Sequence, residues 1–345
     1  MPDALWIERL WYGDGGRAAL ARALLTPISW GFRAAVRARN ALYDTGVLHS
    51  SGAAIPVLSV GNLTVGGTGK TPVAAYLAGR LRQMGARPAL VMRGVGDDES
   101  KVFAFIAPGV PVIADPQRTR GVAAAVRAGC DVAVLDDAFQ HRAIRRDVDV
   151  VLVSADRSAD RAQVLPAGPL REPWTALSRA HTVIVTRKAA STEQAASLRD
   201  QIQLRFPGAK VAQVLLTAAE LVRWSTEERH PIDVLRGRRV LAVAGIGDPA
   251  AFLKQLGAYA SQVEACVFRD HHAYSEREAG EIATSANAFD LVVCTLKDAV
   301  KLGPVWPRQG PALWYVSQHL EVEKGEDEIE RMLARLLDLR PANRS

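Results

Sequence analysis

The stretch from Pro56 to Pro72, PVLSVGNLTVGGTGKTP, constrains the fold most, because it reads as a strand, a glycine-rich loop and the start of a helix. Val57 to Val60 form a short apolar run of the kind that is buried in a parallel sheet. Glycines carry no Cβ, so successive backbone N–H groups of the loop can turn inward around a polyphosphate. The residues that we expect to bind a nucleotide are Gly66, Gly67, Thr68, Gly69, Lys70 and Thr71.

Two side chains at the end of this loop have a defined chemistry. In the P-loop pattern G-x-x-x-x-G-K-[ST], the lysine reaches the β and γ phosphates and the hydroxyl ligates Mg²⁺, and Lys70 and Thr71 occupy these positions. Pro72 suits the first turn of the following helix, whose positive end attracts an anion. Thr64 replaces the first glycine of the pattern, which leaves an ordinary glycine-rich turn as the alternative. The flanking strand and helix favour the nucleotide site.

The composition is that of a globular protein. A chain of 345 residues with 48% hydrophobic content suggests about two domains with ordinary buried cores. The three cysteines lie far apart in apolar segments, so neither a disulfide framework nor a zinc site is expected. No apolar stretch approaches the roughly 18 residues of a membrane span, and the N-terminus lacks the features of a signal peptide.

Apolar strands alternate with helical segments from residue 56 to residue 186. This alternation predicts an α/β fold of the P-loop NTPase type, a parallel sheet with helices on both faces. The composition becomes polar and turn-rich before a second α/β pattern begins at Arg239. We therefore expect an N-terminal amphipathic segment, 1–45, a P-loop domain, 46–217, a linker, 218–238, and a smaller C-terminal α/β domain, 239–345.

Carboxylates follow two of the expected strands. The run from Val132 ends in Asp136 and Asp137, the way in which a P-loop protein presents a second magnesium ligand. Packing explains this pair poorly, because unpaired buried charge is costly. We therefore expect Thr71, Asp136 and Asp137 to hold Mg²⁺. The acidic turn 93–99 follows another strand, and its carboxylates could act as a base or a metal ligand, or could simply be solvated.

A histidine pair follows a strand in the C-terminal part of the chain. His271 and His272 could be catalytic, metal-binding or merely exposed, and no further ligands lie at a suitable spacing for a metal site. Asp270 beside His271 better fits an orienting pair. Ser275 and Glu278 resemble a capping box for the next helix.

The N-terminal segment 16–43 is basic and amphipathic. Its apolar residues include Leu20, Leu24 and Trp30, and they lie among several arginines. Such a segment can lie in a bilayer interface with its arginines on anionic head groups, or it can be a surface helix packed on its own domain. The net charge of +6 favours an anionic partner in general.

Six motifs in order, which together cover almost the whole chain, resemble the tetraacyldisaccharide 4'-kinase family of lipid A synthesis. They are GNLTVGGTGKTP at 61–72, LDDAFQH at 135–141, LPAGPLRE at 165–172, AGIGDP at 244–249, RDHHAYS at 269–275 and TLKDAVKL at 295–302. The resemblance implies ATP- and Mg²⁺-dependent phosphorylation of the 4'-hydroxyl of tetraacyldisaccharide 1-phosphate. It also implies a peripheral protein at the cytoplasmic face of the inner membrane.

The resemblance further implies residue roles. In the family an aspartate and a histidine activate the acceptor hydroxyl, and the matching positions are Asp97 and His271. The family's longer insertion after Arg93-Gly94 is absent here, so Asp98 is an alternative to Asp97, and the family's lid over the nucleotide is in question. The predicted catalytic residues are thus Asp97, Asp98, His271 and Lys70, and those at the substrate are Glu172 and His141.

Two other functions fit parts of the sequence. A membrane-associated P-loop switch or partitioning ATPase would use the amphipathic segment for reversible docking, and a kinase of a soluble metabolite would use only the P-loop. Nucleic-acid binding is disfavoured, because aromatic residues make up 6% and no basic stretch is interleaved with them. No obligate protein partner is evident from the sequence.

Overall fold

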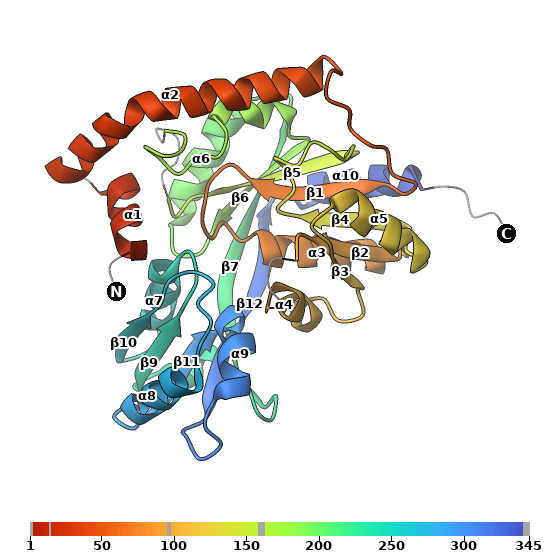
Figure 1. Ribbon diagram of the computed structural model, residues 1–345. Helices are drawn as coiled ribbons and strands as arrows, with labels where there is room; N and C mark the ends of the chain where they lie inside the picture. Colours follow the sequence, from red (N-terminus) through yellow and green to blue (C-terminus); the bar gives the residue numbers. More distant parts are fainter. Residues whose placement is uncertain (1–2, 14, 95–97, 158–162, 341–345) are drawn as a thin grey trace. The chain divides into compact units, whose positions relative to one another are not determined.

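The computed structural model describes residues 3–13, 15–94, 98–157 and 163–340 (Figure 1). The chain forms two compact units. The larger, which we call the P-loop unit, comprises Leu5–Val214 and Val322–Ser345; the second unit comprises Leu215–Glu321 with the first four residues. Two long strands, β7 (Lys210–Arg223) and β12 (Leu313–Lys324), have residues in both units.

The P-loop unit is built on strands in the order β7-β6-β5-β1-β4-β2-β3. The pairs from β6 to β3 are parallel. Besides β7, the strands are β1 (Val57–Asn62), β2 (Pro88–Met92), β3 (Val112–Ala114), β4 (Val132–Asp136), β5 (Val148–Ser154) and β6 (Thr182–Arg187). Every residue of β1, β2, β4 and β5 is buried, as expected of a parallel sheet whose two faces are both covered.

Helices cover both faces of this sheet. Val122 and Ala125 of α5 pack on one face, against side chains of β1, β2 and β4. Since successive strand residues point to opposite faces, the alternate residues of these strands face α3, which contacts the same three strands. The helices of this unit are α1 (Asp3–Tyr12), α2 (Gly16–Asp44), α3 (Lys70–Gln83), α4 (Asp98–Ile106), α5 (Arg118–Arg127), the 3-10 helix η1 (Trp174–Arg179), α6 (Thr192–Arg205) and α10 (Glu326–Asp338).

The end of the chain packs on the P-loop unit. In α10, Glu330 accepts hydrogen bonds from Arg80 of α3, with an ion pair at 2.6 Å, and the Met332 sulfur accepts one from Thr182 of β6 at 3.2 Å. The segment expected as a linker, 218–238, contains the end of β7, strand β8 (Arg229–Pro231) and the 3-10 helix η2 (Ile232–Leu235). A four-part division of the chain by function stays a prediction.

The second unit has strands in the order β10-β9-β11-β12-β7, with β8 antiparallel to β7. The pairs β10–β9, β9–β11 and β11–β12 are parallel. The predicted capping box of Ser275 and Glu278 is confirmed at the start of α8. The remaining elements are β9 (Arg239–Ala244), β10 (Gln262–Val267), β11 (Leu291–Thr295), α7 (Pro249–Gly257), α8 (Glu276–Ala286), α9 (Leu296–Leu302) and the 3-10 helix η3 (Gly303–Val305).

The predicted α/β fold with a mostly parallel sheet and an N-terminal helix is confirmed. Figure 1 shows that helix, α2, as a long rod along one side of the P-loop unit. In the ranges that the structure describes, no helix is both long and apolar enough to cross a bilayer.

Candidate active site

The glycine-rich loop joins the end of β1 to the start of α3. Gly66 and Gly69 have φ angles of 116° and 88°, which L side chains rarely adopt, so the loop needs glycine at both positions. Helix α3 begins at Lys70, directly after Gly69, so its unpaired N–H groups and positive end lie at the loop. This backbone has the features that phosphate binding requires.

Lys70 lies between an amide and a carboxylate. Its Nζ donates to Asn62 Oδ1 at 3.2 Å and is 3.7 Å from Asp137 Oδ1. Asn62 is fully buried at the end of β1, and its Nδ2 donates to Thr68 Oγ1 at 2.8 Å. Gln140 donates to the Asn62 carbonyl at 2.9 Å. Asn62 therefore fixes both a loop side chain and the lysine ammonium.

The segment with the sequence LPAGPLRE runs beside the outer part of the loop. Val65 N donates to Pro169 O at 2.8 Å, and Arg171 N donates to Leu63 O at 2.6 Å. This pairing brings the Arg171 side chain to Asp137, where its Nη1 donates to both carboxylate oxygens at 2.9 Å. Lys70 and Arg171 therefore both lie within ion-pair distance of the carboxylate of Asp137.

The environment of Asp137 keeps it ionised. Burial by itself would raise the pKa of this carboxyl, but the positive charges of Lys70 and Arg171 outweigh burial and hold the pKa below its ordinary value. Asp137 also has a φ of 48°, in the left-handed region, which is uncommon for a residue other than glycine. Such backbone conformations cluster at active sites.

Asp136 is buried at the end of β4. Its Oδ1 accepts a hydrogen bond from Asp137 N at 3.0 Å, and its main-chain oxygen accepts one from Arg118 Nη2 at 3.0 Å. Burial lowers the pKa of the Arg118 guanidinium, while the charges of Asp136 and Asp137 oppose that shift. Three cations, Lys70, Arg118 and Arg171, thus surround the two carboxylates, and this suits an anionic ligand.

The residues predicted for Mg²⁺ have suitable chemistry. The Thr71 hydroxyl and the carboxylates of Asp136 and Asp137 are hard oxygen donors, which Mg²⁺ prefers. Thr71 is buried in the first turn of α3. Over the described residues, no group of three or more His, Cys, Asp or Glu side chains could hold a metal. Phosphate oxygens and water would therefore have to complete the coordination, as is usual for Mg²⁺.

The two residues predicted at the substrate have different surroundings. Glu172 is fully buried, and its carboxylate accepts hydrogen bonds from Arg179 at 3.0 Å and from Asn40 of α2 at 2.7 Å. These contacts join α2 to η1 and to the loop before it, so Glu172 has a structural role whether or not it contacts substrate. His141 is half-buried, and burial together with nearby arginines such as Arg118 lowers its pKa.

The residues predicted for acceptor activation lie in separate parts of the chain. Asp97 is outside the described residues, and Asp98 is the first residue of α4 in the P-loop unit. His271 follows β10 in the second unit, has a φ of 58°, and its Nε2 is 4.0 Å from Asp270 Oδ1. The neighbouring His272 instead stacks on Phe268, so His271 is the exposed member of the pair.

A buried aspartate organises the loop that carries His271. Asp298 of α9 accepts hydrogen bonds from Gly245 N at 2.9 Å, Tyr274 Oη at 2.9 Å and Thr295 Oγ1 at 2.6 Å. Burial raises the pKa of Asp298 despite these donors. The carboxyl therefore ties the turn after β9, the loop 269–275 and the start of α9 together.

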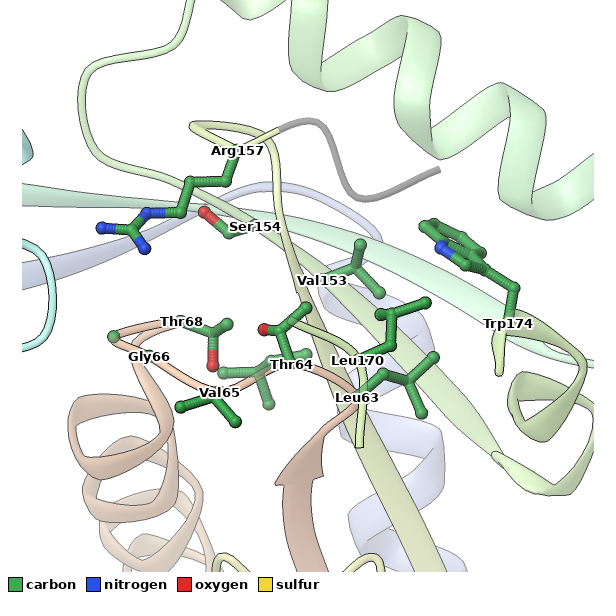
Figure 2. Close-up of a pocket in the computed structure, with 12 residues that line it drawn as sticks. Leu63, Thr64, Val65, Gly66, Thr68, Val153, Ser154, Arg157, Leu170 and Trp174 are labelled. Atoms are coloured by element: carbon green, nitrogen blue, oxygen red, sulfur yellow. The ribbon is translucent and has the colours of Figure 1, made fainter. Parts of the chain in front are cut away.

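A largely apolar cleft lies beside the glycine-rich loop, with an empty volume of about 430 Å³ including the part open to solvent. Figure 2 shows Arg157 and Ser154 beside Thr68 at one end, and Leu170 and Trp174 at the other. The cleft thus offers both polar and apolar surface next to the loop.

Comparison with known proteins identifies the family. Residues 21–338 match the family described as Tetraacyldisaccharide-1-P 4'-kinase. The chain belongs to this family. Curated tetraacyldisaccharide 4'-kinases are similar over nearly the full length: one from Anaeromyxobacter sp. (strain Fw109-5) is 36% identical, covering 95% of each chain. One from Methylobacillus flagellatus is 32% identical, covering 97% of this chain and 96% of its own.

A solved structure of the 4'-kinase family has the same fold. The crystal structure of LpxK from Aquifex aeolicus, in complex with ATP, matches 92% of this chain and 99% of its own with a TM-score of 0.69 and 27% identity. The family resemblance carried by the six motifs is therefore confirmed.

Sequence reasoning missed three residues of this 4'-kinase site. Asn62 and Arg171 both lie inside motifs that the sequence analysis quoted. The signal for Asn62 was an amide at the end of a buried strand, and the signal for Arg171 was an arginine in a loop expected to line the site. Arg118 opens a helix and had no such signal, because its role depends on a contact with Asp136.

Proposed function

We propose that this member of the 4'-kinase family transfers the γ-phosphate of ATP to the 4'-hydroxyl of tetraacyldisaccharide 1-phosphate in lipid A biosynthesis. The observation that carries the proposal is the glycine-rich loop with Lys70 held at its mouth by Asn62 and Asp137, in a chain that matches the family over residues 21–338. Phosphoryl transfer depends mainly on positioning and charge neutralisation, and this edge of the sheet provides both.

Each basic residue of the site has a place in this reaction. Lys70 reaches the β and γ phosphates from the first turn of α3, and Arg171 and Arg118 neutralise charge around them. Thr71, Asp136 and Asp137 would hold Mg²⁺, which when bound neutralises phosphate charge. Asp137 pairs with Lys70 and Arg171 in this structure, and a bound phosphate would offer both cations a second anionic partner.

Activation of the acceptor is assigned to an aspartate and a histidine. Asp97 or Asp98 with His271 would orient the 4'-hydroxyl and take up its proton as the phosphate is transferred. Asp298 supports this assignment indirectly, because it fixes Tyr274 in the loop of His271.

Helix α2 supports docking on a membrane surface. Leu20, Leu24 and Ile28 form one row along the helix and are 63%, 71% and 60% exposed. Ser29 on the other side is buried, and its Oγ accepts a hydrogen bond from Ala167 N at 2.9 Å. One face of α2 therefore packs on its own unit and the other presents apolar side chains. Arg17, Arg33 and Arg37 of the same helix are exposed and can contact anionic head groups. The acceptor's acyl chains and the cytoplasmic face of the inner membrane fit such a peripheral mode.

The experiment that tests the proposal is ATP-dependent phosphorylation of tetraacyldisaccharide 1-phosphate in detergent micelles, with and without Mg²⁺. We expect a lipid product that depends on Mg²⁺ and is lost in Lys70→Ala, since that variant lacks the phosphate contact. If Lys70→Ala turns over the lipid as fast as the wild type does, the glycine-rich loop has no role in the mechanism. ATP hydrolysis without any lipid product would support the switch ATPase instead, and phosphorylation of a soluble acceptor would support the metabolite kinase.

A further inference from the structure

The end of β6 contacts the outer side of the glycine-rich loop. Lys188 Nζ donates to Gly67 O at 2.6 Å, and Thr186 Oγ1 donates to the next carbonyl, Thr68 O, at 2.9 Å. Both side chains are at least partly buried. Two consecutive carbonyls of the loop are thus fixed by side chains of one strand end.

The backbone of Lys188 is itself fixed by a carboxylate. Asp156, just after β5, accepts hydrogen bonds from three successive backbone N–H groups, those of Lys188 at 2.8 Å, Ala189 at 2.7 Å and Ala190 at 2.7 Å. Such a concave set of N–H groups is a typical site for an anion. Here the anion belongs to the chain, and it sets the turn from which the Lys188 side chain reaches the loop.

These contacts constrain the peptide planes of the loop. A trans peptide is planar, so its C=O and the following N–H point in opposite directions. Holding the carbonyls of Gly67 and Thr68 therefore sets the direction of the next two N–H groups: that of Thr68, which donates to Gly66 O at 3.1 Å, and that of Gly69. Glycine has little conformational preference of its own, so this direction has to come from neighbouring groups.

We propose that Lys188 is a positioning residue for nucleotide binding, which holds the glycine-rich loop in its phosphate-binding conformation and is itself set by Asp156. The inference rests on the proposed function only in that the loop binds a nucleotide. A charged donor forms a stronger hydrogen bond than a neutral one, so Lys188 contributes more to this pre-organisation than Thr186 does.

The test compares Lys188→Met, which keeps the apolar stem, with Lys188→Arg, which keeps a charged donor. Lys101→Met, at an exposed position on α4, is the matched control. Binding of a non-hydrolysable ATP analogue with Mg²⁺ is measured by calorimetry without lipid. We expect Lys188→Met to weaken binding about tenfold, which corresponds to about 1.4 kcal/mol. Lys188→Arg should recover most of this loss, and Lys101→Met should bind like the wild type.

Kinetics separate positioning from a general loss of structure. Lys188→Met should raise KM for ATP while kcat at saturating ATP and KM for the lipid stay within about twofold, whereas an unstable enzyme loses kcat. If Lys188→Met does not fold, Thr186→Val, which removes the adjacent donor, should still weaken analogue binding about threefold. The inference is overturned if folded Lys188→Met binds the ATP analogue as tightly as the wild type does. If Lys188→Met does not fold, the same result with Thr186→Val overturns it. Absence of analogue binding by the wild type would instead refute the proposed function.

Discussion

At the scale of single residues, the site is a balance of charges around Asp137. This carboxylate neutralises Lys70 and Arg171 within one short segment of the sheet edge, and both cations would otherwise repel each other. Its ionised state therefore stabilises the folded protein, and the left-handed backbone that presents it is maintained by these contacts.

The lowered pKa of Asp137 has a consequence for stability. A carboxyl whose folded pKa is depressed contributes stability above its unfolded pKa, about 3.9, and loses it as the pH falls through the folded value. We expect Asp137→Asn to be less stable than the wild type at pH 7 and the difference to shrink steadily as the pH falls below about 4. Thermal unfolding of both proteins from pH 7 to pH 3 measures this, and a difference that stays constant would contradict it.

The acceptor-activating residues can be separated by turnover. Asp97→Ala, Asp98→Ala and His271→Ala are compared with the wild type, and nucleotide binding is measured in parallel. Loss of a general base typically lowers turnover about 10²- to 10⁴-fold, so His271→Ala and one aspartate variant should fall in that range with binding unchanged. An effect of Asp98 alone would show that the family position falls on Asp98, and wild-type turnover in all three would refute the pair.

At the scale of elements, α2 has an inner face that packs on its own unit and an outer face that is exposed. Its inner face reaches Glu172, a carboxylate that lies 132 positions away in the sequence, through Asn40, and its outer face carries the exposed apolar row. Sequence periodicity indicated an amphipathic helix and left two interpretations open. In the structure one side of α2 packs on its own unit and the other side is exposed. The helix can therefore be a packed surface helix and still present an apolar face to a bilayer.

The outer face of α2 can be tested without disturbing the inner one. The double variant Leu20→Glu, Leu24→Glu should lower binding to vesicles of anionic phospholipid at least about a hundredfold, because the two leucines together lose roughly 3–6 kcal/mol of apolar burial. The matched control is Leu204→Glu on α6, where the leucine is 86% exposed. Sedimentation with vesicles reports the bound fraction of the protein. An equal loss of vesicle binding in both variants would mean that the added negative charge, and not the apolar row of α2, determines binding.

The inner face of α2 depends on Glu172. Replacing this buried carboxylate by alanine leaves Arg179 without its carboxylate partner, which should lower the free energy of unfolding by about 3–5 kcal/mol. Urea denaturation measures the change. A fully stable Glu172→Ala protein with reduced turnover would instead assign Glu172 to the substrate.

At the scale of the whole molecule, the sequence predicted what depends on local pattern. The strand, loop and helix around Lys70 and the buried parallel strands could be predicted, because apolar runs and glycine spacing are local features of the sequence. The contacts of Arg118 with Asp136, of Arg171 with Asp137 and of α10 with the P-loop unit were not readable. These contacts join residues that only the folded chain brings together.

The path of the chain between its units has a genetic consequence. The chain leaves the P-loop unit along β7 and returns along the neighbouring strand β12, where Gln213 donates to Glu323 at 2.9 Å. The two ends of the segment 215–321 therefore start side by side. In genetic terms, this arrangement would allow one insertion or deletion to add, remove or exchange the segment while the order of the strands around the glycine-rich loop stays intact.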